Sequence, residues 1–328
     1  MAEFWAGALA LTLLLYVVLD GFDLGVGMLF GVAPNETARR HMMQSISPVW
    51  DGNETWLVLA ATILFGAFPM VYALLLSAFY LPLILMLVCL ILRGVAFEFR
   101  YKAVGFRRVW DAGFAGGSLL ASFVQGVTVG ALVQGLPMQD GRYIGGTFGW
   151  LSPFALLCGV GLCLGYALLG AAWLTFKTEE DVRDFGYRVL PWLLGAVLAF
   201  LAAAFAYALA MNLRVLHQWV DRPAMLVLPL IGVGACAGLV YAVRRRVDWM
   251  PFAMTALIFA AAFATLAVSF LPYMVPFTIT IAQAAAPHSS LAFMFWGTGV
   301  FVLPITLVYT LVVYWIFKGK VALAAEYH

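Results

Sequence analysis

Residues 6–30 read AGALALTLLLYVVLDGFDLGVGMLF, an apolar stretch whose only charged side chains are Asp20 and Asp23. About 20 consecutive apolar residues are enough to cross a bilayer as a helix. The stretch is longer than the apolar region of a secretory signal, and no basic residue precedes it. It therefore predicts a first transmembrane helix rather than a cleaved leader.

The same character extends through the whole chain. Of the 328 residues, 65% are hydrophobic and only 10% are charged, against about 25% charged in a soluble domain. The predicted solvent is therefore the bilayer, and no basic run is long enough for nucleic acid. The four cysteines all lie in apolar stretches and are predicted to be small buried side chains, not disulfides or metal ligands.

Further stretches of this kind predict nine transmembrane helices in a single all-α membrane domain over residues 1–328. Their limits are 6–30, 55–75, 77–98, 113–135, 153–176, 190–211, 225–243, 252–275 and 291–316. The second is the least regular, because it contains Pro69 and is followed at once by the third. A re-entrant second segment, with eight crossings in total, is the alternative.

Loop charges discriminate between the two counts, because cytoplasmic loops are enriched in Lys and Arg. With nine crossings and the N-terminus outside, 14 of the 18 basic residues fall on the cytoplasmic side: Arg39, Arg40, Arg100, Lys102, Arg107, Arg108, Lys177, Arg183, Arg188, Arg244, Arg245, Arg246, Lys318 and Lys320. Eight crossings would invert every later loop and remove this bias. The sequence thus predicts nine spans in a bacterial inner membrane, with a periplasmic N-terminus and a cytoplasmic C-terminus.

Charged residues within apolar spans are costly, so they mark candidate sites. Asp20 and Asp23 are three residues apart and share one helix face, and glycines around them allow close helix packing. Such a pair suits a proton path or a cation site. The alternative is that the acids cap helices or pair with basic groups at the interface.

Two further segments carry charge near the same predicted surface. Asp51 and Glu54 lie on one face at the start of a helix, flanked by tryptophans that include Trp56, although acids are also common at helix N-termini. Arg93 and Glu98 close the third span. Arg93 either pairs with a buried acid or anchors the helix at the interface.

Histidine positions argue against a haem held by this chain. None of the four histidines falls within a predicted span, whereas a haem in the bilayer needs axial ligands on facing helices. No zinc, nucleotide or catalytic-triad motif is present either. The sequence predicts that this chain ligates neither haem nor metal.

Three ordered motifs resemble those of one known family. Residues 20–28 (DGFDLGVGM), 48–56 (PVWDGNETW) and 93–100 (RGVAFEFR) are similar to the signatures of subunit II of the cytochrome bd ubiquinol oxidases. Their order and spacing match, and the resemblance covers nearly the whole chain. The short length is closer to the cyanide-insensitive branch of the family.

The resemblance implies two four-helix bundles plus one peripheral helix, paired with a haem-binding subunit I. That partner would carry two b-type haems and one d-type haem and would oxidise quinol, while oxygen is reduced to water. It also implies proton-route roles for Asp23 and Asp51, with Asp20 and Glu54 as weaker members, and an oxygen passage beside Trp56. A bound quinone or lipid and a small single-helix accessory subunit are compatible with it.

The preferred hypothesis is therefore an oxidase subunit that supports the haem subunit and conducts protons and oxygen. A proton- or cation-coupled secondary transporter is the alternative, because buried acids and glycine-interrupted helices also suit that class. A third hypothesis is a scaffold with inert acids. Haem bands and a larger partner in the purified complex would separate the first hypothesis from the second.

Overall fold

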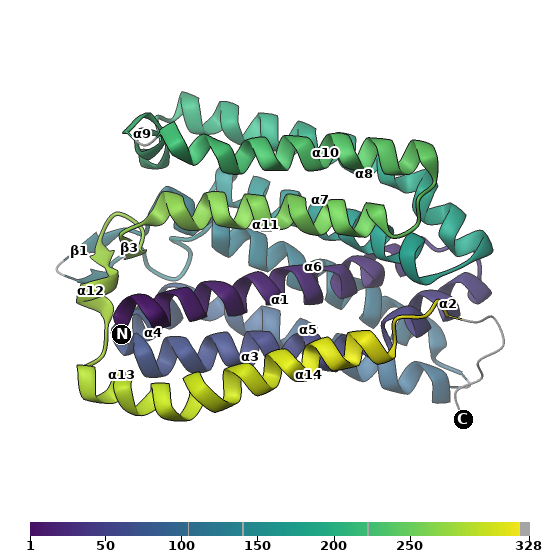
Figure 1. Ribbon diagram of the computed structural model, residues 1–328, viewed down its shortest axis with the longest axis horizontal. Coiled ribbons are helices and arrows are strands. Elements are labelled where there is room, and N and C mark those ends of the chain that lie inside the picture. The colour runs from purple at the N-terminus through teal and green to yellow at the C-terminus, as the bar shows by residue number, and fades with distance from the viewer. Residues whose placement is uncertain (104, 140, 222, 322–328) are drawn as a thin grey trace.

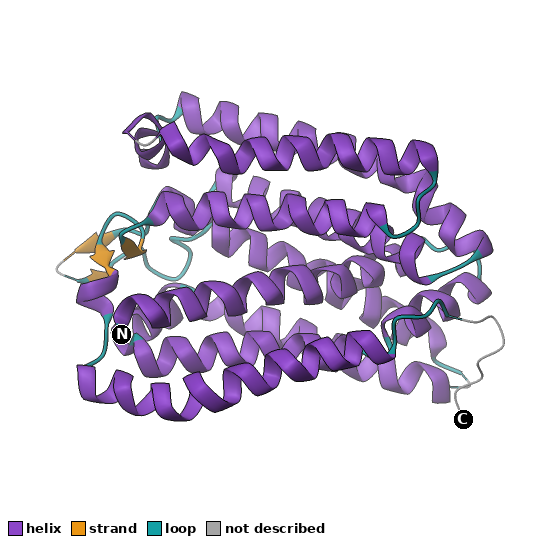
Figure 2. Cartoon of the chain, viewed as in Figure 1, coloured by secondary structure: helices purple, strands orange, loops and turns teal. Residues whose placement is uncertain are grey.

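The computed structural model describes residues 1–103, 105–139, 141–221 and 223–321, and these are almost entirely helical (Figures 1 and 2). The long helices are α1 (Ala2–Gly31), α3 (Trp50–Ala67), α5 (Tyr80–Lys102), α6 (Arg107–Gln134), α7 (Pro153–Lys177), α8 (Glu180–Ala210), α10 (Val227–Arg245), α11 (Met250–Phe270) and α14 (Leu303–Ile316). The shorter ones are α2 (Glu36–Ile46), α4 (Pro69–Ala78), α9 (Arg214–Asp221), α12 (Ile281–Ala284) and α13 (His288–Met294).

The remaining regular structure lies in connections. A 3-10 turn covers Pro223–Leu226, and a π-helical stretch, Phe295–Val302, joins α13 to α14. Two short antiparallel hairpins pair β1 (Met138–Gln139) with β2 (Arg142–Tyr143), and β3 (Tyr273–Val275) with β4 (Ile279–Thr280).

Eight described helical runs are long and apolar enough to cross a membrane, and the bent pair α3 and α4 brings the number to nine if it is counted as one span. The all-α membrane fold is therefore confirmed. The predicted span 55–75 corresponds to the bent pair α3 and α4, in which the chain bends by 120° at the break between the two helices. Phe68 leaves the helical conformation, with φ −135° and ψ 56°, and Pro69 has no N–H to continue the helix.

Helix α1 runs through the middle of the molecule and packs against α3, α6, α7 and α11. Its closest approach is to α7. A Cβ atom on Gly25 would lie 2.7 Å from the carbonyl carbon of Tyr166 and 2.9 Å from the nitrogen of Gly170. Only glycine allows two helix backbones to come this close, so Gly21 and Gly25 fix α1 against α7, whereas Gly27 packs against Ser118 of α6.

Two hydrophobic cores lie along α1. One surrounds Phe22, which stacks on Trp173 with ring centroids 4.0 Å apart. The other contains Trp5 and Trp56. Both cores share partly buried residues of α1, including Leu19. The acids of α1 therefore lie where the two cores meet.

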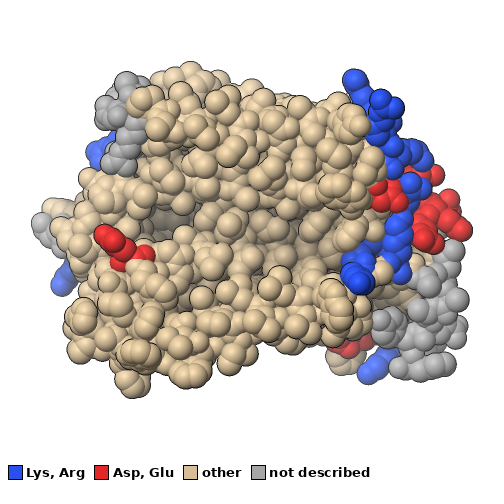
Figure 3. All heavy atoms as spheres, in the orientation of Figure 1, with Lys and Arg blue, Asp and Glu red and all other residues tan. Residues whose placement is uncertain are grey.

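Charged side chains are distributed unevenly along the molecule. In Figure 3, Lys and Arg gather at the right-hand end, and the long apolar face between the two ends has almost none. The charged end is formed by α2, the C-terminal turns of α5 and α10, and the first turns of α6 and α8 (Figure 1). This is the pattern expected of a membrane protein with one basic, interfacial end.

Candidate functional site

The two carboxylates of α1, Asp20 and Asp23, have no exposed surface. The Oδ2 atom of Asp23 accepts a hydrogen bond from Nδ2 of Asn53, on α3, at 2.6 Å. The same Asn53 nitrogen donates to the carbonyl oxygen of Leu19 at 3.3 Å. Asn53 therefore ties the acid-bearing turn of α1 to α3.

Asn53 also extends this network to the last long helix. Its Oδ1 atom accepts a hydrogen bond from the hydroxyl of Tyr314, on α14, at 3.0 Å, although the two residues are 261 positions apart in the sequence. A hydroxyl, an amide and the Asp23 carboxylate thus form one hydrogen-bonded chain across three helices. Neither Asn53 nor Tyr314 was singled out from the sequence. The sequence carries one sign of Asn53, because its amide lies between Asp51 and Glu54 at the start of an apolar helix.

Arg93, on α5, neutralises part of the same cluster. Its side chain is 1% exposed, and its Nη1 lies 2.6 Å from Oε1 of Glu54 and 3.5 Å from Oδ1 of Asp20. The guanidinium also lies 6.0 Å from the ring of Trp50. Arg93 therefore does pair with a buried acid. Its ion pairs connect α5 to α1 and α3.

Several polar atoms of the cluster have no hydrogen-bond partner among the described residues. They are Oδ2 of Asp20, Oδ1 of Asp23, and Nε and Nη2 of Arg93. Buried polar atoms in proteins are nearly always hydrogen-bonded, either to protein or to ordered water. Four such atoms in one cluster make this a favourable place for internal water molecules.

A second chain of hydrogen bonds approaches Asp20 from α6 and α7. The hydroxyl of Tyr166 donates to Oε1 of Gln125 at 3.0 Å, and Nε2 of Gln125 donates to the hydroxyl oxygen of Tyr16 at 2.7 Å. Tyr16 and Asp20 are four residues apart on α1 and share a helix face. The only sign of this chain in the sequence is the amide of Gln125 in the middle of a predicted span.

The other candidate residues are not brought together. Asp51 and Glu98 are exposed, and neither forms an ion pair within the described ranges. Glu54 is partly buried and reaches Arg93, so Asp51 and Glu54 do not act on the same partner. Trp56 is fully buried in the core that also contains Trp5. The structure thus groups Asp20, Asp23, Glu54 and Arg93, and leaves Asp51 and Glu98 at the surface.

At the charged end, Arg100 forms an ion-pair centre that the sequence did not reveal. It is 2% exposed, and its Nη2 lies 2.8 Å from Oε2 of Glu36. Its Nε contacts Asp111, which Arg39 also reaches at 3.3 Å. This cluster joins α2, the end of α5 and the start of α6.

A second ion-pair centre surrounds Asp248, in the turn between α10 and α11. Lys320, Arg183 and Tyr187 donate hydrogen bonds to its carboxylate at 2.7, 2.8 and 2.9 Å. Burial alone would raise the pKa of Asp248, but these hydrogen bonds outweigh it and lower the pKa below its ordinary value of 3.8. The segment after α14 is therefore fastened to α8 and to this turn.

The histidines do not fit the axial positions of a haem. His41 lies on α2 and His288 starts α13, at opposite ends of the molecule (Figure 1). The last span begins at His288 rather than at residue 291, so the prediction that every histidine lies outside the spans needs this correction. The side chain of His217 and all of His328 fall outside the described part. Within that part, no group of His, Cys, Asp and Glu side chains is arranged to hold a metal ion.

Comparison with known proteins agrees with this architecture. The family described as cytochrome bd terminal oxidase subunit II matches residues 1–317. Cytochrome bd-I ubiquinol oxidase subunit 2 of Escherichia coli K12 is 31% identical over 358 aligned residues, covering 97% of this chain and 94% of that protein. A probable cytochrome oxidase subunit 2 of Haemophilus influenzae is 42% identical over 188 residues, which cover 55% of this chain and 50% of that protein.

The fold is also found in a solved structure. A chain of the bd oxidase from Geobacillus thermodenitrificans superposes with a TM-score of 0.79 at 17% sequence identity, covering 96% of this chain and 98% of that one. Sequence and fold lead to one conclusion: the chain belongs to the cytochrome bd terminal oxidase subunit II family.

Proposed function

We propose that this chain is the haem-free subunit II of a bd-type quinol oxidase and that it delivers protons and oxygen to its haem-binding partner. Membership of the family makes the chain a subunit of a quinol:oxygen oxidoreductase, and implies a subunit I. The haems and the quinol site belong to that partner in this proposal. A bound quinone and a small accessory subunit are compatible with it.

The observation that carries the proton proposal is the buried cluster of Asp20, Asp23, Glu54 and Arg93. Asp20 and Glu54 contact the single guanidinium of Arg93, and the fully buried Asp23, three residues from Asp20 on α1, is held by Asn53. With every group ionised, the cluster would therefore hold more negative than positive charge. Net buried charge is costly. A cluster of this kind binds and releases protons instead, and its unpartnered polar atoms would hold the water that carries them.

The charged end supplies the orientation in this proposal. Cytoplasmic segments of membrane proteins are rich in Lys and Arg, so we assign the end that contains Arg100 and Asp248 to the cytoplasm and the N-terminus to the periplasm. Asp20 and Asp23 lie in the half of α1 nearer that end. Protons consumed in oxygen reduction would then enter from the cytoplasm and reach Asp23 beside Asn53.

We place Asp51 on the same proton route, at the point where the route reaches the surface of this chain. Its carboxylate is exposed on α3 next to apolar surface that includes Val58, which is 64% exposed. Asp51 lies in the first turn of α3, near the charged end, and the apolar surface that follows it on α3 would otherwise face lipid. We therefore infer that subunit I covers this face and receives protons there. Oxygen is apolar, and the buried surroundings of Trp56 suit its passage.

The proposal is tested by removing one titrating group without changing its size. Asp23→Asn, in the purified oxidase complex, should slow quinol-driven oxygen consumption about 10²-fold, the lower end of the range for a proton-transfer group. Asp51→Asn should slow it as well. Haem content and anaerobic haem reduction by quinol should stay normal, because quinol is oxidised on the partner.

Glu98→Gln is the matched control, since it removes an exposed carboxylate that has no ion pair within the described residues. Wild-type turnover in Asp23→Asn across the pH range would refute the relay. A complex that fails to assemble would instead assign Asp23 a structural role. No contact in this cluster favours the transporter hypothesis. A haem-free chain that purifies without a partner would support that hypothesis instead.

A further inference from the structure

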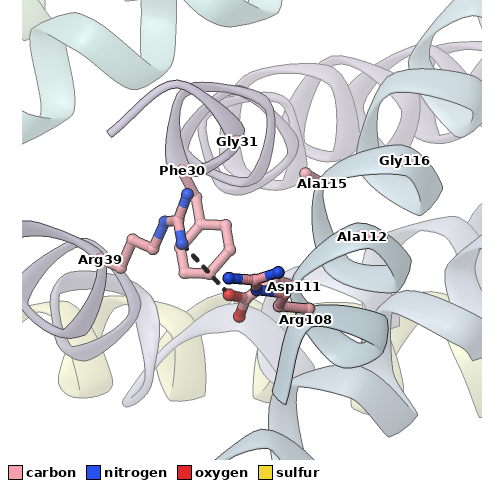
Figure 4. A pocket seen from close by; sticks show the side chains of 8 residues that line it. All are labelled: Phe30, Gly31, Arg39, Arg108, Asp111, Ala112, Ala115 and Gly116. Carbon is pink, nitrogen blue, oxygen red and sulfur yellow. Dashed lines mark hydrogen bonds and ion pairs between the residues drawn. The ribbon is translucent and has the colours of Figure 1, made fainter. Parts of the chain in front are cut away.

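A hollow at the charged end lies apart from the proton cluster. It is lined by the last turn of α1, by α2 and by the first turns of α6, with Gly31, Arg39, Arg108 and Asp111 at its mouth. Figure 4 shows the side chains of Arg39 and Arg108 converging from different helices beside Asp111. The first turn of α6 also contributes the positive end of its helix dipole.

Positive charge is in excess around this hollow. Four arginines and two carboxylates take part in the local network: Arg39, Arg100, Arg107, Arg108, Glu36 and Asp111. The buried guanidinium of Arg100 already contacts both acids. Arg108 forms no ion pair within the described ranges, and Nε of Arg39 is enclosed without a hydrogen-bond partner there. A bound anion would balance this excess of positive charge.

The hollow lies at the depth of a membrane interface. Phe106 and Val109, beside the arginines, are 75% and 61% exposed, which suits apolar side chains that meet lipid. From the hollow, an exposed apolar stripe runs along α6 towards the middle of the molecule. It consists of Ala112, Gly116 and Leu119, whose spacings of four and three residues place them on one face.

Gly116 makes this stripe a shallow track. A Cβ atom at that position would meet nothing within 4 Å, so the surface beside it is open. An acyl chain that follows the stripe would bring its phosphate to Arg39 and Arg108. A soluble anion would bind the arginines but would not contact the apolar stripe.

We propose that this hollow binds an anionic phospholipid, with the phosphate between Arg39 and Arg108 and one acyl chain along Ala112, Gly116 and Leu119 of α6. The lipid would bridge α1, α2 and α6 at the cytoplasmic surface. The site is independent of the proton cluster, because it shares no residue with it.

The test uses the purified oxidase complex, loaded with dioleoyl phosphatidylglycerol or with zwitterionic dioleoyl phosphatidylethanolamine, and counts bound lipid by native mass spectrometry. Each arginine near a membrane surface contributes about 1 kcal/mol to anionic lipid binding, or about fivefold in affinity. Arg39→Gln with Arg108→Gln should therefore weaken phosphatidylglycerol binding about 25-fold. Binding of phosphatidylethanolamine should change little.

Arg40→Gln with Lys102→Gln is the matched control, because it removes two charges from the same end without touching the hollow. Equal losses in the two double variants, or no tightly bound phosphatidylglycerol in the wild type, would overturn the proposal. Arg108→Gln alone breaks no ion pair within the described residues, so we expect this variant to fold normally and to show the effect of one lost charge on lipid binding. Gly116→Leu fills the track and should also weaken phosphatidylglycerol binding; unchanged binding would contradict the placement of the acyl chain along α6.

Discussion

Arg93 offers the sharpest test of how the buried cluster is held together. Its side chain is 1% exposed and faces two carboxylates, of which Asp20 is fully buried and Glu54 is 26% exposed. Replacing Arg93 by Met keeps an unbranched apolar stem but leaves both acids without a counter-charge. Breaking a buried ion pair in this way costs about 3–5 kcal/mol.

The geometry places the expected cost at the lower end of that range. Nη1 of Arg93 is 3.5 Å from Asp20 and 2.6 Å from Glu54, so the stronger contact is with the acid that water can partly reach. We therefore expect Arg93→Met to cost about 3 kcal/mol, which is about a hundredfold in the ratio of assembled to disrupted complex.

The assay measures how much haem-containing complex survives heating in detergent, across a series of temperatures. The triple variant Arg93→Met, Asp20→Asn and Glu54→Gln removes the two carboxylate charges that contact Arg93 and should recover much of the lost stability, because neither of Arg93's partners is then left as an unpaired charge. Arg107→Met is the control: that arginine is 45% exposed and pairs with Glu36 at 3.5 Å, so it should cost less than about 1 kcal/mol. Equal stability of Arg93→Met and wild type would show that the ion pairs do not hold the cluster together, as would a triple variant no more stable than the single one.

Three further predictions concern packing, pH and topology. Gly25→Leu should prevent the close contact of α1 with α7 and abolish assembly, whereas Gly7→Leu, where a Cβ meets nothing within 4 Å, should purify normally; equal yields would contradict this. Asp248→Asn should destabilise the complex by about 1 kcal/mol at neutral pH. Because the folded-state pKa of Asp248 is lowered from 3.8, its contribution is present above that value and is lost as the pH falls below it, so wild type and variant should melt alike only in that acidic range. A reporter enzyme active only in the periplasm, fused to the C-terminus, should be silent, and strong activity would invert the proposed orientation.

Much of the fold follows from the sequence, because the bilayer imposes a simple rule. Spans must be apolar over about 20 residues, and the predicted limits of most spans fall within a few residues of the observed helices, for example 153–176 against Pro153–Lys177. The sharp bend within the second span could not be predicted, because hydropathy ignores backbone geometry. Residues 55–75 are apolar throughout, yet the chain turns by 120° at Phe68 and Pro69.

The buried cluster was predicted in part. A charge within a span is visible in any apolar sequence, so Asp20, Asp23 and Arg93 could be found. Which residue of α3 faces them depends on the rotation of that helix, since successive residues differ by about 100°. Asn53 and Glu54 point towards α1 and α5, and Asp51 points away.

Tyr314 shows that contacts between distant helices cannot be predicted from the sequence. It lies near the end of the last span, where a tyrosine is expected as an interfacial anchor. Its contact with Asn53 joins residues 261 positions apart, and no local pattern encodes which of two distant helices will be neighbours. The same holds for Arg100 with Glu36, where loop charges predicted the side of the membrane but not the ion pairs.

We propose that Asp23 and its neighbours carry protons from the charged end of this chain. The most direct measurement is proton uptake by the oxidase complex in oriented vesicles, recorded with a pH dye on each side while the fully reduced enzyme reacts with oxygen. We expect uptake only from the side that carries Arg100 and Asp248, slowed by Asp23→Asn and unchanged by Glu98→Gln. Uptake from the opposite side, or an unchanged rate in Asp23→Asn, would contradict it.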